Sequence, residues 1–485
     1  MYRALTVIHA LGLMLILFSI TYLLPIITSE IYDDGTLIDF AWAMLMTFLA
    51  GSLMWTLTKR YKGELSVRHG YLLVVVMWTA IPAFATLPLL MVLPNLSFTD
   101  AYFETMSGLT TTGATVLTGL DGMSKAINLW RHELNWLGGM GIIVLAVAIM
   151  PLLGIGGRQL YKAETPGPMK DSTLTPRITE TARNLWLVYL SITIACIVSL
   201  KVAGMSWFDA VCHAFAAMGL GGFSTHDESV GFFNSPAIEV VLIVFMLLSA
   251  MNFATHFLAW REKSLRQYWS DIEGIATVIV VLASSLLIGC YLWWEGVYPS
   301  FWTALRHASF NLVSLATDCG FAGEDFNKWP IFAPLWMLFL SCVVASSGST
   351  GGGIKMVRTM ILFKQAGREF RKLLHPAAIN PMKVGGSVIP NAIVFSVLGF
   401  IFLYFMSVVM LTFALLISGL DFISAFSAII ACINNAGPGL GVVGPASNYG
   451  VLTDFQTWVC TLAMLIGRLE IITLLIIFTP KFWQR

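Results

Sequence analysis

Charged residues are scarce in this 485-residue chain: Asp, Glu, Lys and Arg together make up only 11% of it. Hydrophobic residues make up 57%, and the mean hydropathy is +0.79. A water-soluble domain of this length could not cover its surface with so few polar side chains. The composition therefore excludes a soluble globular protein and predicts a polytopic membrane protein.

The sequence also lacks the motifs of disulfide frameworks, metal sites and enzymes. Its seven cysteines show no paired spacing, which predicts buried thiols, and no two of its eight histidines share a segment at metal-ligand spacing. No nucleophile motif, dinucleotide fingerprint or acid pair stands out. We therefore expect no enzyme activity, no catalytic residue, no cofactor and no nucleic-acid partner. The first apolar run is too long for a signal-peptide core of ~7–15 residues, so we expect it to be retained.

Long apolar runs are what the sequence has instead. A helix needs roughly 20 apolar residues to span the hydrocarbon of a bilayer, in contact with membrane lipid. Ten such runs predict an all-α integral membrane protein with ten transmembrane helices. The predicted spans cover residues 4–27, 38–57, 71–93, 135–155, 184–204, 237–260, 274–294, 331–363, 389–417 and 455–478.

Basic residues concentrate in alternate connections between these spans. The opposite connections are acidic or nearly neutral. Because Lys and Arg mark cytoplasmic connections, both termini are predicted to be cytoplasmic. The basic residues are Lys59, Arg60, Lys62 and Arg68; Arg158, Lys162, Lys170 and Arg177; Arg261, Lys263 and Arg266; Lys364, Arg368, Arg371, Lys372 and Lys383; and Lys481 and Arg485.

A short polar stretch around Gly113 recurs three more times. It reads TTTGAT at residues 110–115 and follows a segment, 100–109, that is too short to cross a bilayer. Similar turns surround Gly222, Gly320 and Gly437, at intervals of 109, 98 and 117 residues. Twelve residues before each glycine lies an alanine, and the residues before these alanines, which predict the starts of four half-helices, are Asp100, Asp209, His307 and Ser424.

The glycine turns predict four re-entrant half-helices, in four pseudo-symmetric helix–pore loop–helix repeats around one central pore. The expected units are a two-span N-terminal unit at residues 1–70 and pore repeats at 71–183, 184–272, 273–388 and 389–485. In the third repeat the eighth span is expected to be broken.

Backbone that is not helical is tolerated at membrane depth only where it is buried in protein or lines a water-filled cavity. Glycine adopts φ values closed to other residues, so that carbonyl oxygens can form a ring that replaces the hydration shell of a cation. The alternative, that these glycines only allow close helix packing, stays open. The predicted filter residues are Thr111, Thr112 and Gly113; Leu220, Gly221 and Gly222; Asp318, Cys319 and Gly320; and Asn435, Ala436 and Gly437.

A glycine-rich segment at 345–355 interrupts the eighth span, because four glycines in six residues break a helix. It is not a phosphate-binding loop, since Ile354 separates the lysine from the last glycine and no strand precedes it. The segment is either a flexible kink or an intramembrane gate. The candidate gate residues are Gly348, Ser349, Thr350, Gly351, Gly352, Gly353 and Lys355.

Arg468 lies inside the last apolar run, where a charge is costly unless it faces water or a partner. Glu470 is two residues away and points to another helix face. Arg468 is expected to be either half of a structural Arg–Glu pair or a barrier to cations beside the pore, as part of the gate.

Four repeats with one glycine each, behind two extra N-terminal spans, resemble the bacterial TrkH-type potassium transporter subunits, in the wider group that includes KtrB and plant HKT proteins. Motifs such as GGFST at 221–225 and NAG at 435–437 carry this resemblance. It implies a potassium-selective, channel-like uptake subunit of the bacterial inner membrane that conducts K⁺ and also Rb⁺, and it supports the gate at 345–355. Gly113, rather than serine, goes with potassium preference in that group.

The resemblance also implies a homodimer and a cytoplasmic ring of TrkA-type subunits that bind NAD or ATP and dock on the basic inner face. An alternative is a secondary transporter that binds a small organic solute at the broken eighth span. Such folds usually have inverted halves, whereas these four repeats share one orientation. Whether transport is passive or coupled to H⁺ or Na⁺ stays open.

Overall fold

The chain folds almost entirely into helices. The computed structural model describes residues 2–61, 67–141, 178–376 and 380–484. Within these ranges the only strands are β1 (Lys383–Val384) and β2 (Ser387–Val388), an antiparallel pair that corrects the all-α prediction in one small place. The long continuous helices are α1 (Tyr2–Ser19) with η1 (Ile20–Tyr22) and α2 (Leu23–Tyr32), α3 (Leu37–Leu57), α4 (Val67–Val92), α9 (Ile178–Val202), α14 (Ile272–Trp294) and α18 (Asn391–Ile417).

These six helical runs are long and apolar enough to cross a membrane. They coincide with six of the ten predicted spans to within a few residues. Three other predicted spans are broken. The described parts are α11 (Pro236–Ala250) and α12 (Phe253–Glu262); α16 (Phe332–Val343) and α17 (Met356–Leu374); and α20 (Asp454–Arg468), α21 (Ile471–Leu475) and η9 (Ile476–Phe478).

The sequence predicted a break only in the eighth span, so the breaks in the sixth and tenth spans are corrections. The sixth bends by 97° and the tenth by 111°. At the first bend the side chain of Asn252 caps α12 by accepting a hydrogen bond from the Ala254 N–H at 2.8 Å. At the second, Glu470 adopts a left-handed φ of 56°. The hydropathy of the sequence did not predict either bend, because the helices on both sides of each bend are apolar and form one continuous apolar run.

The fourth predicted span, 135–155, lies mostly outside the described residues, so its extent is not tested. Its first residues belong to α6 (Lys125–Gly139), which starts where the Ser124 side chain accepts a hydrogen bond from the Ile127 N–H at 3.3 Å. The remainder lies outside the described residues. So do several of the basic residues used to predict orientation: Lys62, Arg158, Lys162, Lys170, Arg177 and Arg485.

Four short, buried helices lie at the centre: α5 (Phe98–Leu109), α10 (Trp207–Gly219), α15 (Phe301–Ala316) and α19 (Phe422–Asn434). All four begin earlier than predicted. Three are capped by the side chains of Ser97, Ser206 and Asp421, and α15 follows Ser300. The sequence predicted Asp100, Asp209 and Ser424 as the N-caps, but each is the third residue of its helix. The backbone N–H of each donates a hydrogen bond to the side chain of the actual N-cap: Asp100 to Ser97, Asp209 to Ser206 and Ser424 to Asp421.

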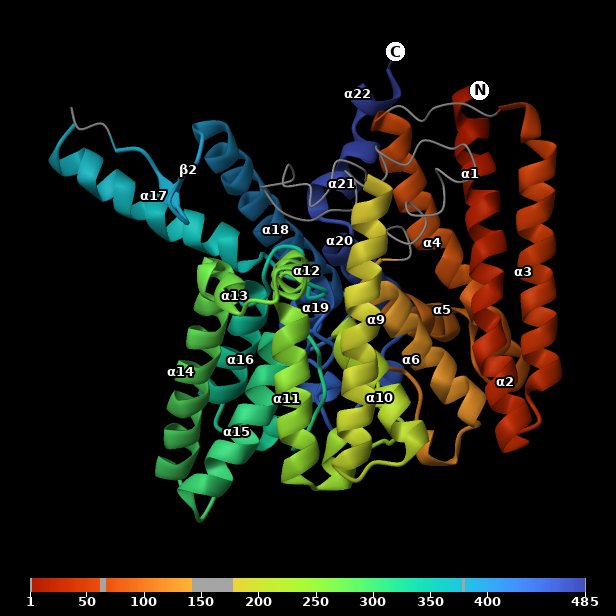
Figure 1. The fold of residues 1–485 in the computed structure, drawn as a ribbon, viewed down its shortest axis with the longest axis horizontal. Helices are drawn as coiled ribbons and strands as arrows, with labels where there is room; N and C mark the ends of the chain where they lie inside the picture. The colour runs from red at the N-terminus through yellow and green to blue at the C-terminus, as the bar shows by residue number, and fades with distance from the viewer. Residues whose placement is uncertain (1, 62–66, 142–177, 377–379, 485) are drawn as a thin grey trace.

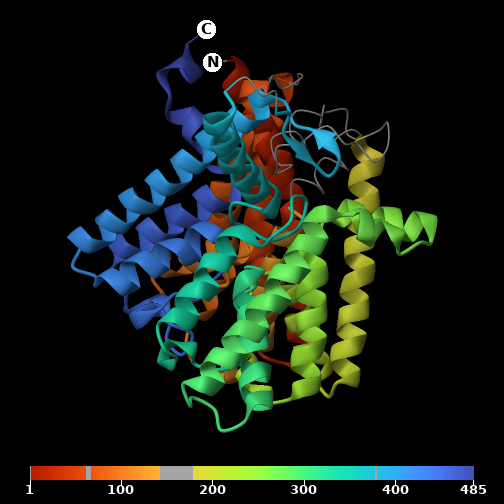
Figure 2. The same cartoon turned by 90° about the vertical axis from the view of Figure 1, so that its left-hand side faces the viewer.

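The short helices pack in a cyclic order. Each contacts the following helix of its own repeat, and each also contacts the corresponding helix of the preceding repeat: α5 packs on α20, α10 on α6, α15 on α11 and α19 on α16. Figures 1 and 2 show the longer helices around this centre, with α1 and α3 at the edge of the molecule. Both termini lie at one end, and α17 projects from the body near that end (Figure 1).

Candidate functional site

Each short helix ends in the same turn. In every turn the residue two before the glycine and the glycine itself have left-handed backbones, with φ between 55° and 88°. The N–H between them donates to the carbonyl five residues back, which is the bond of a Schellman motif. These bonds are Thr112 to Ser107 at 2.8 Å, Gly221 to Ala216 at 2.9 Å, Cys319 to Ser314 at 2.8 Å and Ala436 to Ala431 at 2.8 Å.

The four turns close into a ring. A Cβ atom built on any one of the four glycines would overlap or crowd a backbone carbonyl oxygen of another turn. That carbonyl always belongs to the residue just before the next glycine. The distances are 1.8 Å from Gly113 to Gly221 O, 2.1 Å from Gly222 to Cys319 O, 2.5 Å from Gly320 to Ala436 O and 2.7 Å from Gly437 to Thr112 O. The structure thus brings the twelve sequence-predicted filter residues together.

Polar side chains on the short helices hold the chain that leaves each turn. Glu104 lies nine residues before Gly113 and accepts a hydrogen bond from the Val116 N–H at 3.0 Å. At the same offset, Asn311 accepts from the Gly323 N–H at 2.9 Å, and His213 lies 3.0 Å from Ser224 Oγ. These residues were not predicted from the sequence, although a polar residue nine positions before the turn glycine recurs in three of the apolar short helices and could have indicated them. In the fourth repeat Ser427, ten residues before the glycine, accepts from the Leu440 N–H at 2.8 Å.

A buried ion pair joins the first and second turns. Arg131 Nε lies 2.7 Å from Glu104 Oε1, and both side chains are 1% exposed. The guanidinium also donates to Thr115 Oγ1 and to the Ser224 carbonyl, each at 3.2 Å. Sequence reasoning missed this pair too, because its partners lie on different helices.

Removing Arg131 is expected to destabilise the protein strongly. Arg131→Met leaves the Glu104 carboxylate buried without its ion partner, which costs about 3–5 kcal/mol. The measurement is thermal unfolding of the purified protein in detergent. Lys328→Met is the matched control, since Lys328 is 82% exposed in its ion pair with Asp325 and such pairs contribute about 0–1 kcal/mol. Equal stability losses in the two variants would contradict the structural role of Arg131.

The ring lies between two cavities. The outer cavity, of about 80 Å³, is lined by three of the four glycines and by loop residues such as Asp227. There Asp227 accepts from the Gly119 N–H at 3.0 Å, and Asp121 accepts from the Asp227 N–H at 3.2 Å. The hydrogen bond from His226 lowers the pKa of Asp121, so this contact stabilises the loops at neutral pH and is lost as the pH falls through that lowered pKa.

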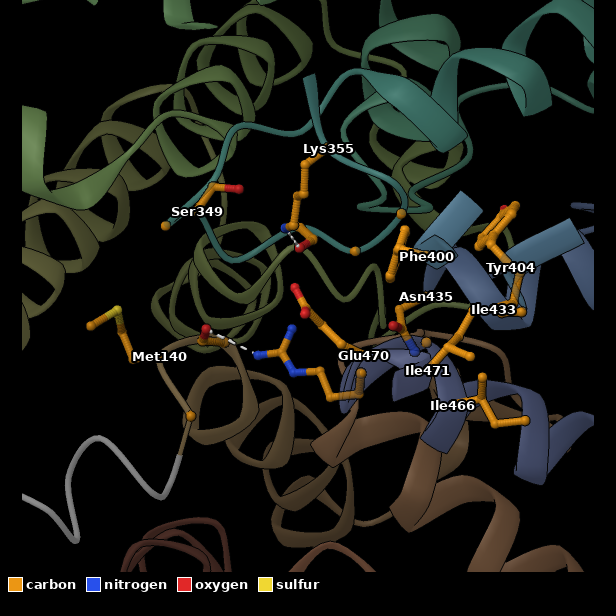
Figure 3. Close-up of a pocket in the computed structure, with 18 of the residues that line it drawn as sticks. Met140, Ser349, Lys355, Phe400, Tyr404, Ile433, Asn435, Ile466, Glu470 and Ile471 are labelled. Carbon is orange, nitrogen blue, oxygen red and sulfur yellow. Dashed lines mark hydrogen bonds between the residues drawn. The ribbon is translucent and has the colours of Figure 1, made fainter. Parts of the chain in front are cut away.

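The inner cavity, of about 130 Å³, lies beneath the ring and is lined by residues of the predicted gate (Figure 3). The loop between α16 and α17 crosses here, against the ends of three short helices. Thr350 Oγ1 donates to the Met218 carbonyl of α10 at 3.1 Å. Cβ atoms built on Gly351 and Gly352 would lie 3.2 Å from Thr317 O and 1.9 Å from Asn434 O. No side chain larger than hydrogen fits at Gly352.

Arg468 connects the remaining turn to this loop. Its guanidinium donates to Thr111 Oγ1 at 3.3 Å, to the Thr350 carbonyl at 3.0 Å and to the Gly139 carbonyl at 3.1 Å, and it also reaches Gly138 O. The Glu470 carboxylate forms an ion pair with Arg358 of α17 at 2.7 Å. The predicted filter and gate residues therefore meet in one layered site.

Comparison with known proteins decides the family. A family model described as cation transport protein TrkH matches residues 38–292 and 299–485. The chain belongs to the TrkH family. The Trk system potassium uptake protein TrkH of Salmonella typhimurium is 45% identical over 484 residues, covering 100% of this chain and 99% of that protein. The protein of the same name from Vibrio parahaemolyticus is 46% identical over 482 residues, covering 99% of both chains.

The fold agrees with a solved structure of the TrkH family. The crystal structure of the potassium transporter TrkH from Vibrio parahaemolyticus superposes with a TM-score of 0.90 at 44% sequence identity, covering 99% of this chain and 100% of that chain. The resemblance read from the glycine turns is thus confirmed. The similarity extends over both the N-terminal helices and the four turns.

Proposed function

We propose that this chain is the membrane subunit that carries potassium through a potassium uptake system. The observation that carries the proposal is the closed ring, in which four carbonyl oxygens from four different turns face one another's glycines. Oxygen rings of this kind replace the hydration shell of K⁺. The relatives at 45% and 46% identity are named as potassium uptake proteins.

The filter of the proposed pore consists of the twelve residues of the glycine turns. The short helices end at the ring, so that their partial negative charges favour a cation there. Each turn has a single glycine whose position all four turns share, which is shorter than the carbonyl stack of tetrameric potassium channels. We therefore expect moderate selectivity of K⁺ and Rb⁺ over Na⁺. No enzyme activity and no bound cofactor belong to this function.

The proposed gate is the loop between α16 and α17 together with Arg468. Supporting this role, the loop contacts the ends of three short helices and the arginine contacts Thr111 of the first turn, so that all four repeats are reached from the inner side. A fixed positive charge beneath the ring raises the energy of a passing cation. The simple kink alternative is less well supported, because a kink requires no such contacts.

The proposed architecture has ten spans and four re-entrant half-helices, in the repeats at 71–183, 184–272, 273–388 and 389–485 behind an N-terminal unit at 1–70. Its support is the cyclic packing of the short helices. We place the chain in the inner membrane with both termini cytoplasmic. The basic segments η2 (Lys59–Tyr61), α17 and α22 (Pro480–Trp483) favour this orientation, because they lie toward the end that holds both termini (Figure 1).

The proposed partners are a second copy of the chain and a ring of TrkA-type nucleotide-binding subunits. The relatives belong to a named Trk system, which suits an assembly of several subunits. On α17, Phe370, Leu373 and Leu374 are 68%, 79% and 76% exposed. A projecting helix with such apolar side chains supports docking of a further chain.

Transport of an organic solute is the weaker alternative. The inner cavity beside the broken eighth span has about 130 Å³, whereas sites for small organic ligands usually have ~300–1,000 Å³. Its size suits a cation with little water.

Ion flux into proteoliposomes that contain this chain alone tests the proposal. Potassium and rubidium are expected to enter at least roughly tenfold faster than sodium and lithium, a ratio that needs only about 1.4 kcal/mol of discrimination. Comparison with and without a pH gradient shows whether flux is coupled to protons. Equal rates for all these ions, or competition by amino acids or sugars, would contradict a potassium pathway.

A further inference from the structure

The carboxylate of Asp318 is buried directly beneath the ring. Asp318 occupies the left-handed position of the third turn, next to Cys319, whose carbonyl belongs to the ring. Its side chain is fully buried, and neither oxygen accepts a hydrogen bond from a described residue. The Gly352 N–H faces it without reaching hydrogen-bond geometry. An ionised carboxylate is costly to bury unless a positive charge lies near it, so this position favours a cation.

The ammonium of Lys355 is a positive charge near enough to attract this carboxylate, although the two groups form no direct ion pair. Lys355 is 4% exposed, and its Nζ donates to the Gly351 carbonyl. Figure 3 shows this bond and the side chain directed into the inner cavity. A Cβ atom built on Gly351 would lie 3.4 Å from Asp318 Oδ2, so the ammonium and the carboxylate both lie beside this glycine. Asp318 and Glu470 attract the ammonium, while Arg358 and Arg468 repel it.

A second buried oxygen without a partner faces the neighbouring glycine. Asn435 holds the left-handed position of the fourth turn, and its Oδ1 accepts no hydrogen bond from a described residue. The amide nitrogen donates to Thr112 Oγ1 at 3.0 Å and to the Met464 carbonyl at 3.1 Å, which fixes the orientation of the amide. Its Oδ1 would lie 3.2 Å from a Cβ built on Gly352. Two adjacent turns therefore direct unused oxygens at Gly351 and Gly352.

We propose that Asp318 and Asn435 form a binding site for a monovalent cation just inside the ring, for which the Lys355 ammonium substitutes while the loop lies against the turns. The inference rests on the proposed function and extends it. When the loop withdraws, the ammonium withdraws with it, and a permeating K⁺ binds between the carboxylate and the amide oxygen. Lys355 is thus a tethered competitor of the transported ion.

Flux measured over a series of potassium concentrations tests the site. Asp318→Asn is expected to raise the concentration for half-maximal flux roughly tenfold, and Asp318→Glu to restore part of the affinity. Lys355→Met is expected to lower that concentration, because the competitor is gone. The double variant should behave like Asp318→Asn alone, since without the carboxylate the ammonium has nothing to compete for. The matched controls are Lys364→Met, on the exposed side of α17, and Asp325→Asn, in the outer loop of the same repeat.

The variants distinguish failure of the proposed cation site from failure of the proposed potassium transport. If the native chain conducts potassium and Lys355→Met leaves the half-maximal concentration unchanged, the proposed site is wrong. This arm retains Asp318, so it holds even where Asp318→Asn fails to fold. The proposal is also overturned if the double variant follows Lys355→Met rather than Asp318→Asn. A native chain that conducts no potassium overturns the proposed function itself, and the inference with it.

Discussion

Gly113→Ser is expected to remove most of the preference for potassium over sodium. A Cβ atom at this position would lie 1.8 Å from the Gly221 carbonyl oxygen, and Gly113 has a φ of 77° that side-chain-bearing residues rarely adopt. The new side chain therefore displaces one of the four ring oxygens. If this oxygen contributes about 1.4 kcal/mol to the discrimination between K⁺ and Na⁺, its loss lowers the K⁺/Na⁺ permeability ratio roughly tenfold.

The measurement is the permeability ratio from reversal potentials or from competing fluxes in proteoliposomes. Gly119→Ser is a closely matched control. Gly119 also has a positive φ, 72°, and lies six residues away in the outer loop, but no atom lies within 4 Å of its built Cβ. It carries the same backbone strain without touching the ring. An unchanged ratio in folded Gly113→Ser protein would refute the filter assignment at this turn.

Arg468→Ala is expected to increase potassium flux. The substitution removes a positive charge beneath the ring and releases the hydrogen bonds that join Thr111 to the Thr350 carbonyl. Two unit charges 4 Å apart interact by about 4 kcal/mol at an effective dielectric constant of 20. Relief of about 1.4–2.8 kcal/mol of this barrier corresponds to roughly ten- to hundredfold higher flux.

Arg468→Lys separates the charge from the hydrogen bonds. Lysine retains the charge but cannot reproduce the fork of donors, so flux should rise less than in Arg468→Ala if the charge sets the barrier. Equal increases in the two variants would instead assign the effect to the released loop. Deletion of residues 348–353 should also raise flux. Unchanged or lower flux in folded Arg468→Ala protein would contradict the gate.

The spans show how much of the fold could be predicted. The apolar run at 38–57 coincides with α3 (Leu37–Leu57), and the run at 274–294 coincides with α14 (Ile272–Trp294). In these segments the length of apolar sequence translates directly into helix, because every backbone group is satisfied within the helix. The bends at Asn252 and Glu470 were not predicted, since the chain stays apolar across them and only the packed neighbours require a change of direction.

The sequence predicted the glycines of the four turns but not the second left-handed residue in each turn. The four glycines were found because a left-handed backbone in an apolar chain favours glycine. Thr111, Leu220, Asp318 and Asn435 share the left-handed conformation without being glycine, so their backbone left no signature in composition. Their conformation is imposed by the Schellman bond that ends each helix.

The sequence by itself determined that this chain has membrane-spanning apolar helices, that it carries four glycine turns in register and that it belongs with the TrkH-type proteins, because apolar length and glycine register are local properties. Only the tertiary structure decided which carbonyl faces which glycine, that Arg131 pairs with Glu104, and that Lys355 and Asp318 both lie beside Gly351. These contacts join residues from different helices. Their energies depend on burial and distance, which exist only once the helices have packed.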